Sequence, residues 1–264
     1  VKVAEQFAFT EGPAVDKAGN IYFTDQPNDK IWKYDVDGRL SLFMEKTGRS
    51  NGMAFNRQGQ LISCADEKNQ LLIIDANKQT KVLLSGFQGK AFNGPNDLWI
   101  DKHGGIYFTD PYYQRSYWTR KQPELPKQNL YYLPKGAREA IIVDSNLVQP
   151  NGITGTPDGK TLFVADIRDN KTYRYTIAAS GALGNRTLFA GMGSDGMTLD
   201  EQGNLYLTGK GVTVYNAAGI KQGTIAVPAG WVGNICFGGR NRKTLFITAS
   251  TAVYTLAMQV KGVE

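Results

Sequence analysis

The chain has 264 residues, of which 41% are hydrophobic and 20% charged, and its formal net charge is +6. This length suits one folded unit, and no apolar run approaches the roughly 18 residues that a membrane-spanning helix needs. The basic residues are scattered, without a block of five or six like charges, which argues against a nucleic-acid-binding surface. With 30 glycines and 11% aromatic residues, the composition favours short strands joined by tight turns.

The two cysteines, Cys64 and Cys236, form neither a CxxC pair nor a Cys/His metal-binding spacing. We place them in different repeats and expect thiols that are unlinked and partly buried. The sequence begins at Val1 without a signal peptide. That fits a soluble protein that is either cytoplasmic or exported to the periplasm after signal removal, so the compartment stays open. We expect a monomer or a weak homo-oligomer.

One phrase recurs along the chain, as DKAGNIYFTD over residues 16–25, DKHGGIYFTD over residues 101–110, and looser copies elsewhere. The copies begin at Asp16, Arg57, Asp101, Pro157, Asp200 and Gly239. Each copy is a turn followed by a β-rich run, so the six copies predict an all-β repeat protein.

A polar residue precedes each copy at a fixed distance. It lies eight positions before the glycine of the turn, or before Arg242, which replaces that glycine in the last copy. These six residues, called the anchor residues below, are Glu11, Asn51, Asn96, Asn151, Asp195 and Asn234. The intervals between them are 40, 45, 55, 44 and 39 residues. A four-stranded propeller blade takes roughly 40–45 residues, so one repeat corresponds to one blade.

The second repeat shows the expected strands most clearly, over residues 52–55, 61–64, 71–74 and 81–84. The last repeat supplies only three strands and ends near residues 253–258, whereas the leading segment 2–7 is spare. We therefore predict a single domain over residues 1–264, a six-bladed β-propeller with four-stranded blades. The N-terminal strand would join the C-terminal blade and close the ring.

The 55-residue interval contains an insertion at about residues 112–128. Its aromatic and basic residues are Tyr112, Tyr113, Tyr117, Trp118, Arg115, Arg120 and Lys121. We predict that this insertion forms a loop over one face of the propeller.

The anchor residues should converge, because the first strand of each blade lines the central channel of a propeller. Their side chains offer carboxylate and amide oxygens. Two unpartnered carboxylates in a partly desolvated channel would be costly, and one divalent cation would offset that cost. An all-oxygen set suits Ca²⁺, Mg²⁺ or Mn²⁺.

A turn role is the alternative for single anchor residues, since Asn-Gly and Asp-Gly are common turn pairs and four anchors precede glycine. It does not explain Asn96 or Asn234, which precede Asp97 and Ile235, nor does it explain Glu11.

Other polar residues carry less information. His103, the only histidine, lies in a turn, so the chain has no Ser-His-Asp triad and no histidine metal site. Asp110 is the strand-ending aspartate that we expect to support the site. Asp97 is adjacent to an anchor and either supports it or bonds a turn. Trp231 either walls the pocket or packs between blades.

An ordered set of motifs spans nearly the whole chain. They are FTEGPAVD from Phe9, SNGMAF from Ser50, NGPNDLWID from Asn93, FTDPYY from Phe108, QPNGI from Gln149, SDGMTLD from Ser194 and NICFGG from Asn234. The set resembles the gluconolactonase, senescence marker protein and luciferin-regenerating enzyme family, and is closest to its bacterial gluconolactonases. The resemblance implies a six-bladed propeller with one divalent cation, Ca²⁺ first, with Mg²⁺, Mn²⁺, Zn²⁺ or Fe²⁺ as alternatives.

The resemblance also implies roles for individual residues. Glu11 of EGP and Asn151 of PNG would be metal ligands, and Asp195 of SDG would be both a ligand and the catalytic base. Asn96, first of the Asn-Asp pair, would contact metal or substrate, and Asn51 matches a substrate-side position more loosely. Many bacterial relatives have CEH where residues 64–66 here read CAD, a departure that bears on substrate preference and not on the metal.

We therefore expect a lactonase in which metal-activated water opens a sugar lactone such as gluconolactone. Asp195 would take the proton of that water, while Asn51, Asn96, Tyr113 and Trp118 would bind substrate. Two alternatives are a metal-dependent phosphotriesterase using the same site, and a non-enzymatic propeller that binds a ligand.

Overall fold

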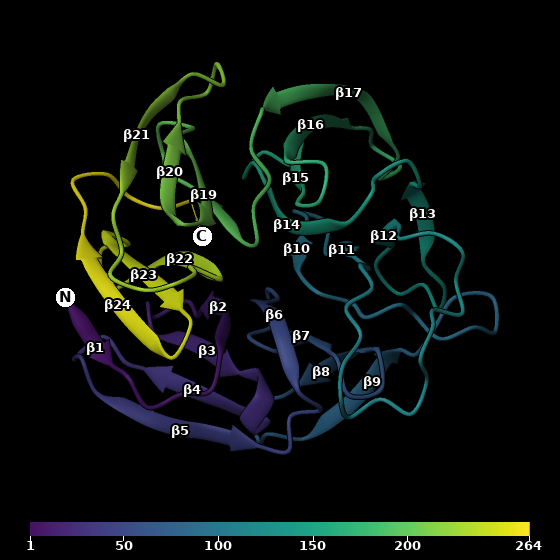
Figure 1. Ribbon diagram of the computed structural model, residues 1–264, viewed down its shortest axis with the longest axis horizontal. Helices are drawn as coiled ribbons and strands as arrows, with labels where there is room; N and C mark the ends of the chain where they lie inside the picture. Colours follow the sequence, from purple (N-terminus) through teal and green to yellow (C-terminus); the bar gives the residue numbers. More distant parts are fainter. Residues whose placement is uncertain (264) are drawn as a thin grey trace.

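Six four-stranded antiparallel sheets surround a central channel in the computed structural model, which describes residues 1–263 (Figure 1). The strands β2, β6, β10, β14 and β22 lie nearest the centre, and successive strands of each blade lie farther out. The predicted six-bladed propeller with four-stranded blades is therefore confirmed.

The blades follow one another in chain order. Blade 1 has β2 (Thr10–Val15), β3 (Ile21–Asp25), the short 3₁₀ helix η1 (Gln26–Asn28), β4 (Lys30–Tyr34) and β5 (Leu40–Glu45). Blade 2 has β6 (Ser50–Phe55), β7 (Leu61–Ala65), β8 (Gln70–Ile74) and β9 (Thr80–Leu84). Blade 3 has β10 (Leu98–Ile100), β11 (Ile106–Thr109), β12 (Leu130–Leu133) and β13 (Ile141–Asp144). The four strands expected in blade 2 are confirmed to within two residues at each end.

The second half of the ring has the same plan. Blade 4 has β14 (Pro150–Gly155), β15 (Thr161–Asp166), β16 (Lys171–Ile177) and β17 (Leu183–Ala190). Blade 5 has β18 (Met197–Leu199), β19 (Leu205–Gly209), β20 (Gly211–Tyr215) and β21 (Lys221–Ile225). Blade 6 has β22 (Asn234–Gly238), β23 (Thr244–Ala249), β24 (Ala252–Ala257) and, at its outer edge, β1 (Lys2–Ala4).

The N-terminal segment closes the ring as predicted. β1 pairs antiparallel with β24, where Lys2 lies opposite Tyr254. Phe7 then turns into the apolar layer between blades 6 and 1, where it is 5% exposed and packs edge-on against Phe23 and Trp32 at centroid distances of 5.2 and 5.5 Å. The first residues of the chain therefore connect the last blade to the first.

Apolar clusters fill the spaces between neighbouring blades. Phe92 and Phe108 lie in the cluster between blades 2 and 3, and Phe23 and Phe246 lie in the cluster between blades 6 and 1. Each sheet buries both faces against its neighbours, so its strands form near-continuous apolar runs such as LFITA in β23. This packing fixes the rotation of each blade and with it the position of each inner strand.

The inner strands approach one another so closely that glycine follows four of the anchor residues. A Cβ atom on Gly52 would lie 2.4 Å from Oδ1 of Asp97, and a Cβ atom on Gly196 would lie 2.1 Å from Cγ of Asn234. The four glycines are Gly12, Gly52, Gly152 and Gly196. Each lets the anchor region of the next blade come into contact.

Threonine hydroxyls on second strands connect adjacent blades at the same level. Thr24 Oγ1 donates to the Asn51 carbonyl at 3.3 Å, and Thr109 Oγ1 donates to the Asn151 carbonyl at 2.8 Å. Because these carbonyls belong to anchor residues of the following blade, the threonines hold each anchor against its neighbour.

Residues 110–129 connect β11 to β12 and contain the insertion expected at about 112–128. Cys64 in β7 and Cys236 in β22 are buried in different blades and form no disulfide, and His103 is an exposed turn residue. Over residues 1–263 no helix has the length and apolar character to cross a membrane.

We predict that Phe7→Ala lowers the free energy of unfolding by about 3–5 kcal/mol, because a buried aromatic ring at the ring closure is replaced by a cavity. Urea denaturation measures the change. Leu42→Ala on β5, where the side chain is 42% exposed, is the control and should cost less than about 1 kcal/mol. Equal costs for the two variants would show that Phe7 has no special role in closure.

Candidate metal and substrate site

The anchor residues lie at one end of the channel because each occupies the start of an inner strand. Glu11, Asn51 and Asn151 are the second residues of β2, β6 and β14, and Asn234 is the first residue of β22. Asn96 and Asp195 precede β10 and β18 by two residues. Five of the six side chains are buried, while Asp195 is half-buried and therefore the most accessible of them.

Irregularities in the sheets lie directly beside three anchors. The pairing register shifts between Glu11 and Ala14 in β2, between Ser50 and Met53 in β6, and between Pro150 and Ile153 in β14. A bulge of this kind interrupts the ladder and re-aims a side chain. The anchor side chains are therefore released from the normal alternation at the channel mouth.

Aspartates that end second strands fix the chain just before the anchors. Asp110 accepts hydrogen bonds from the backbone N–H groups of Asn93 and Gly94 at 3.0 and 2.8 Å, and so holds the approach to Asn96. Asp25 and Asp166 bind the equivalent N–H groups in blades 1 and 4. These carboxylates support the anchors from the side, as expected for Asp110.

Asp195 has a hydrogen-bond donor on each carboxylate oxygen. Asn151 Nδ2 donates to Oδ1 at 2.9 Å, and Trp231 Nε1 donates to Oδ2 at 2.6 Å. Asn151 Nδ2 also donates to the Tyr113 hydroxyl at 2.9 Å. Trp231 is therefore part of the site, and the insertion reaches it through Tyr113.

Glu11 and Asp97 bring two more carboxylates to the same region. Glu11 Oε2 accepts the N–H of Gly12 at 2.9 Å. Asp97 Oδ1 accepts the N–H of Leu98 at 2.9 Å, and Asp97 Oδ2 accepts Nδ2 of Asn234 at 3.2 Å. Asp97 thus bonds to an anchor, which is the supporting role that the sequence left open, and its bond to Leu98 lies at the start of β10 and not in a turn.

Asn51 and Asn96 border this cluster and are held through their main chains. The Asn51 carbonyl accepts the Thr24 hydroxyl, and the Asn96 carbonyl accepts the N–H of Gly52 at 2.8 Å. Both side chains are buried.

Burial raises the pKa of all three acids. It raises the pKa of Glu11 well above its usual value, and the charge of Asp195 raises it further. Burial raises the pKa of Asp195 to about 6, although hydrogen bonds from Trp231 and Asn151 partly offset this. Burial likewise raises the pKa of Asp97 to about 7. Burial therefore favours the neutral forms of these acids in the absence of a bound cation.

The donor types at the mouth match those that a hard divalent cation binds. Oδ1 of Asn151 is buried and has no hydrogen-bond partner within residues 1–263. The amide nitrogen of the same side chain donates two hydrogen bonds, to Tyr113 and to Asp195. In the same described range, no three or more His, Cys, Asp or Glu side chains are grouped so that they could hold a metal. A cation here would therefore depend on the Asn151 oxygen in addition to the carboxylates of Glu11 and Asp195.

The insertion folds over the mouth and is fixed by Asp66, a residue that the sequence did not single out as functional. Arg115 Nε donates to Asp66 Oδ2 at 2.6 Å, and Trp118 Nε1 donates to the Asp66 carbonyl at 2.8 Å. Trp118 is 5% exposed and packs within the insertion, whereas Tyr113 contacts an anchor residue. Ala65 pairs with Ser50 as Asp25 pairs with Thr10, so Asp66 lies one residue past the capping position, and the spacing of the sequence did not reveal this.

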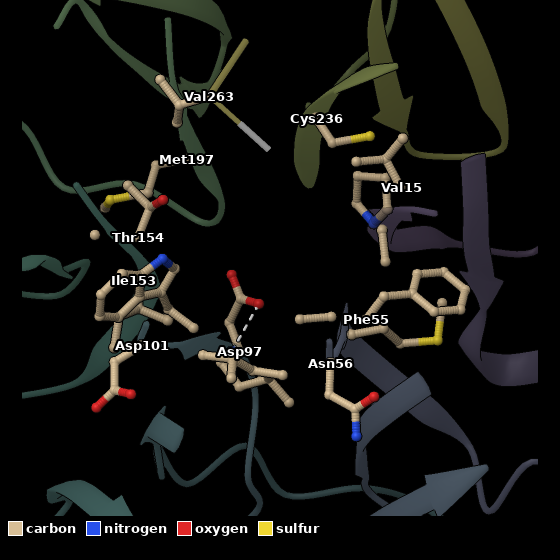
Figure 2. A pocket seen from close by; sticks show the side chains of 18 of the residues that line it. Val15, Phe55, Asn56, Asp97, Asp101, Ile153, Thr154, Met197, Cys236 and Val263 are labelled. Atoms are coloured by element: carbon tan, nitrogen blue, oxygen red, sulfur yellow. Dashed lines mark hydrogen bonds between the residues drawn. The ribbon is translucent and has the colours of Figure 1, made fainter. Parts of the chain in front are cut away.

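A cavity of about 370 Å³ lies at the opposite end of the channel (Figure 2). Asp97 points into its centre, between Ile153 on one side and Phe55 on the other. Asn234 is the one anchor residue that lines this cavity. Asp97 and Asn234, which are hydrogen-bonded to each other, therefore both line this cavity.

Comparison with known proteins places this architecture in a family. Residues 9–251 match the family described as "SMP-30/Gluconolactonase/LRE-like region". The chain belongs to this family. The membership predicted from the ordered motifs is therefore confirmed.

The relatives of this SMP-30/gluconolactonase family member include proteins named as lactonases. The gluconolactonase of Zymomonas mobilis is 29% identical over 98% of this chain and 81% of its own length. A solved gluconolactonase of Xanthomonas campestris superimposes with a TM-score of 0.89 at 28% identity, covering 97% of this chain and 88% of that one. A second structure, described provisionally as a gluconolactonase, has a TM-score of 0.91 at 30% identity. The match covers 100% of this chain and 93% of that one. The interpretation of the chain as a gluconolactonase-like enzyme is confirmed at this level.

The raised carboxyl pKa values predict a pH-dependent stability of the protein treated with a chelator. The pKa of Asp195 rises from 3.8 to about 6 on folding. Its contribution to stability is therefore present below about pH 4 and lost as the pH rises through about 6. The unfolding free energy of wild type should therefore decrease between pH 4 and pH 8. In Asp195→Asn this decrease should be smaller by about 2 kcal/mol.

Urea denaturation in the presence of chelator at the two pH values measures this effect. Asp37→Asn, at an aspartate whose side chain is 52% exposed, is the matched control. A pH dependence that is the same in Asp195→Asn and wild type would contradict the assignment of the raised pKa to this site.

Proposed function

We propose that this chain is a divalent-metal-dependent lactonase that opens a sugar lactone such as gluconolactone. The observation that carries the proposal is the meeting of Glu11, Asn151 and Asp195 at the channel mouth, with the Asn151 oxygen buried and unbonded among residues 1–263. Family membership and the gluconolactonase relatives supply the reaction class.

Glu11, Asn151 and Asp195 would hold the cation, with Asn96 as a further ligand or a substrate contact. All of these donors are oxygens, so Ca²⁺ is the first candidate and Mg²⁺ or Mn²⁺ the next, while Zn²⁺ and Fe²⁺ remain alternatives. When bound, a divalent cation polarises an ester carbonyl and lowers the pKa of water.

Asp195 is the proposed base. Its carboxylate is half-buried, so it can meet a water molecule from the mouth, and donors on both oxygens fix its orientation. Without metal its pKa is about 6, and a bound cation would lower it, so the carboxylate would be ionised at neutral pH and able to accept a proton. Trp231 would hold Oδ2 while a lone pair of the carboxylate takes the proton of the attacking water.

The remaining contacts favour a polyhydroxylated substrate. The Tyr113 hydroxyl accepts from Asn151, which leaves its own proton for a substrate oxygen. Asn51 and Asn96 would offer amide groups to substrate hydroxyls. Trp118 is buried within the insertion and would act by shaping the wall of the pocket above them.

We predict that Asp195→Ala loses most bound metal and lowers lactone hydrolysis at least about 100-fold, because the variant lacks both a ligand and the base. Elemental analysis before and after chelation measures the metal. A pH-indicator screen over a lactone panel, with several metals added back, measures the activity. Asp37→Ala should match wild type in both assays.

Other outcomes of these assays would contradict the proposal. Wild-type-like turnover in Asp195→Ala would rule out the assignment of the base. Hydrolysis of an aryl phosphotriester without hydrolysis of any lactone would favour a phosphotriesterase. A protein without metal under replete conditions, and inactive on both, would favour a non-enzymatic ligand-binding propeller.

A further inference from the structure

An open pocket of about 460 Å³ lies beside the channel mouth, at a place that the proposed chemistry does not use. Gln26 and Pro27 of η1 form one side, Arg49 precedes β6, and residues 114–117 of the insertion form the other side. Two arginines, Arg49 and Arg115, line it.

Asp66 fixes the insertion side of this pocket through one oxygen. Its Oδ2 accepts Arg115 Nε at 2.6 Å, the Tyr117 hydroxyl at 2.7 Å and Gln26 Nε2 at 3.0 Å. Since Arg115 uses Nε here, its two terminal nitrogens make no hydrogen bond with any residue in 1–263. The side chain of Asp66 is 4% exposed, whereas that of Arg115 is 27% exposed, so the cation and not the anion faces solvent.

Arg49 presents a second guanidinium to the same pocket. Its guanidinium carbon lies 4.2 Å from the centroid of the Tyr117 ring, and Nη1 donates to the Pro27 carbonyl at 2.6 Å. The nearby carboxylate of Asp29 binds the backbone N–H of Arg49 and not its guanidinium. Stacking on Tyr117 and one hydrogen bond to a carbonyl therefore hold Arg49 in place. Its guanidinium forms no ion pair with any carboxylate in residues 1–263.

Arg115 also connects this pocket to the candidate site. Its guanidinium carbon lies 5.7 Å from the centroid of the Tyr113 ring, and the Tyr113 hydroxyl bonds to Asn151. The positive charge of Arg115 is close enough to contribute to lowering the pKa of Asp195. Tyr113 therefore lies between Arg115 and the anchor Asn151, and a substrate bound at Asp195 would pass Tyr113 to reach the two arginines.

We propose that Arg49 and Arg115 form an anion-binding subsite that takes a carboxylate or phosphate group carried by the substrate at a distance from its lactone ester. Guanidinium groups bind both anions through paired N–H donors. This inference rests on the proposed lactonase function and makes it more specific: the preferred substrates are acidic sugar lactones, and neutral ones are poorer.

Steady-state hydrolysis of three lactones tests the subsite. Glucono-δ-lactone is neutral, glucaro-1,4-lactone carries a carboxylate, and 6-phosphoglucono-δ-lactone carries a phosphate, so the two charged substrates distinguish the source of the anion. Wild type should show a higher kcat/KM for at least one charged lactone than for the neutral one. Arg115→Gln should lower the ratio of kcat/KM for that charged lactone to kcat/KM for the neutral lactone about tenfold or more, chiefly through KM. Arg49→Gln should act in the same direction.

Three further variants separate charge from loop geometry. Arg115→Lys keeps the charge and should restore part of the preference. Tyr117→Phe removes another hydrogen bond between the insertion and Asp66 without removing charge. If it loosens the loop, kcat/KM should fall for all three lactones together. Arg39→Gln removes the charge of an arginine whose side chain is 77% exposed, and it should leave kcat/KM for all three lactones unchanged.

The outcomes distinguish this inference from the proposed function. Hydrolysis of the neutral lactone with no preference for a charged one, or an equal loss on all substrates in Arg115→Gln, would overturn the subsite alone. No hydrolysis of any lactone would overturn the proposed function. In that case calorimetric titration with inorganic phosphate decides: binding that is lost in Arg115→Gln supports the subsite, and no binding to wild type overturns it.

Discussion

The close approach of the six inner strands is the constraint on which the site depends. At Gly52 and Gly196 any side chain would overlap Asp97 or Asn234 of the next blade, so glycine is what allows neighbouring anchors to meet. Threonine hydroxyls on the second strands, such as Thr109 Oγ1, also bind the anchors of the next blade and keep the blades close together. Each Asn-Gly or Asp-Gly pair therefore combines a side chain that offers an oxygen with a residue that leaves room for the next blade. Gly52 lies within strand β6, so a turn does not explain its pair with Asn51.

The fold and the register of the anchors were predictable because both follow from repetition. Each blade buries the same faces against its neighbours, so a polar residue at a fixed position in each repeat reaches the same level of the channel. Glu11, Asn151 and Asp195 come together for this reason, although 44 or more residues separate each from the next. The closure by β1 was predictable too, because the last repeat was one strand short.

Contacts made by parts that do not repeat were not predictable in the same way. Trp231 binds Asp195 from the loop before β22, and Arg115 binds Asp66 from the insertion. A comparison of the copies shows that blade 2 has Ala65 where blade 1 has Asp25, with Asp66 one residue later. The sequence alone does not exclude Asp66 as a cap, because Asp166 lies equally far from its turn glycine and does cap. The strand register decides: Asp166 pairs with Pro150, whereas in blade 2 Ala65 pairs with Ser50, so Asp66 lies one residue past the capping position. The partner it binds depends on how the insertion folds, which no periodicity encodes.

The balance of charge explains why amides outnumber acids among the anchors. The charges of Asp195 and Asp97 raise the cost of ionising Glu11, and the hydrogen-bond donors Gly12, Trp231 and Asn234 that reach these acids are neutral. Three carboxylates already lie close together here, so a further one in the ring would add to the cost of ionisation. Asparagine supplies an oxygen without that charge. The positive groups, Arg49 and Arg115, line the pocket beside the mouth and lie outside the ring of anchors, where the proposed subsite would attract an anionic substrate.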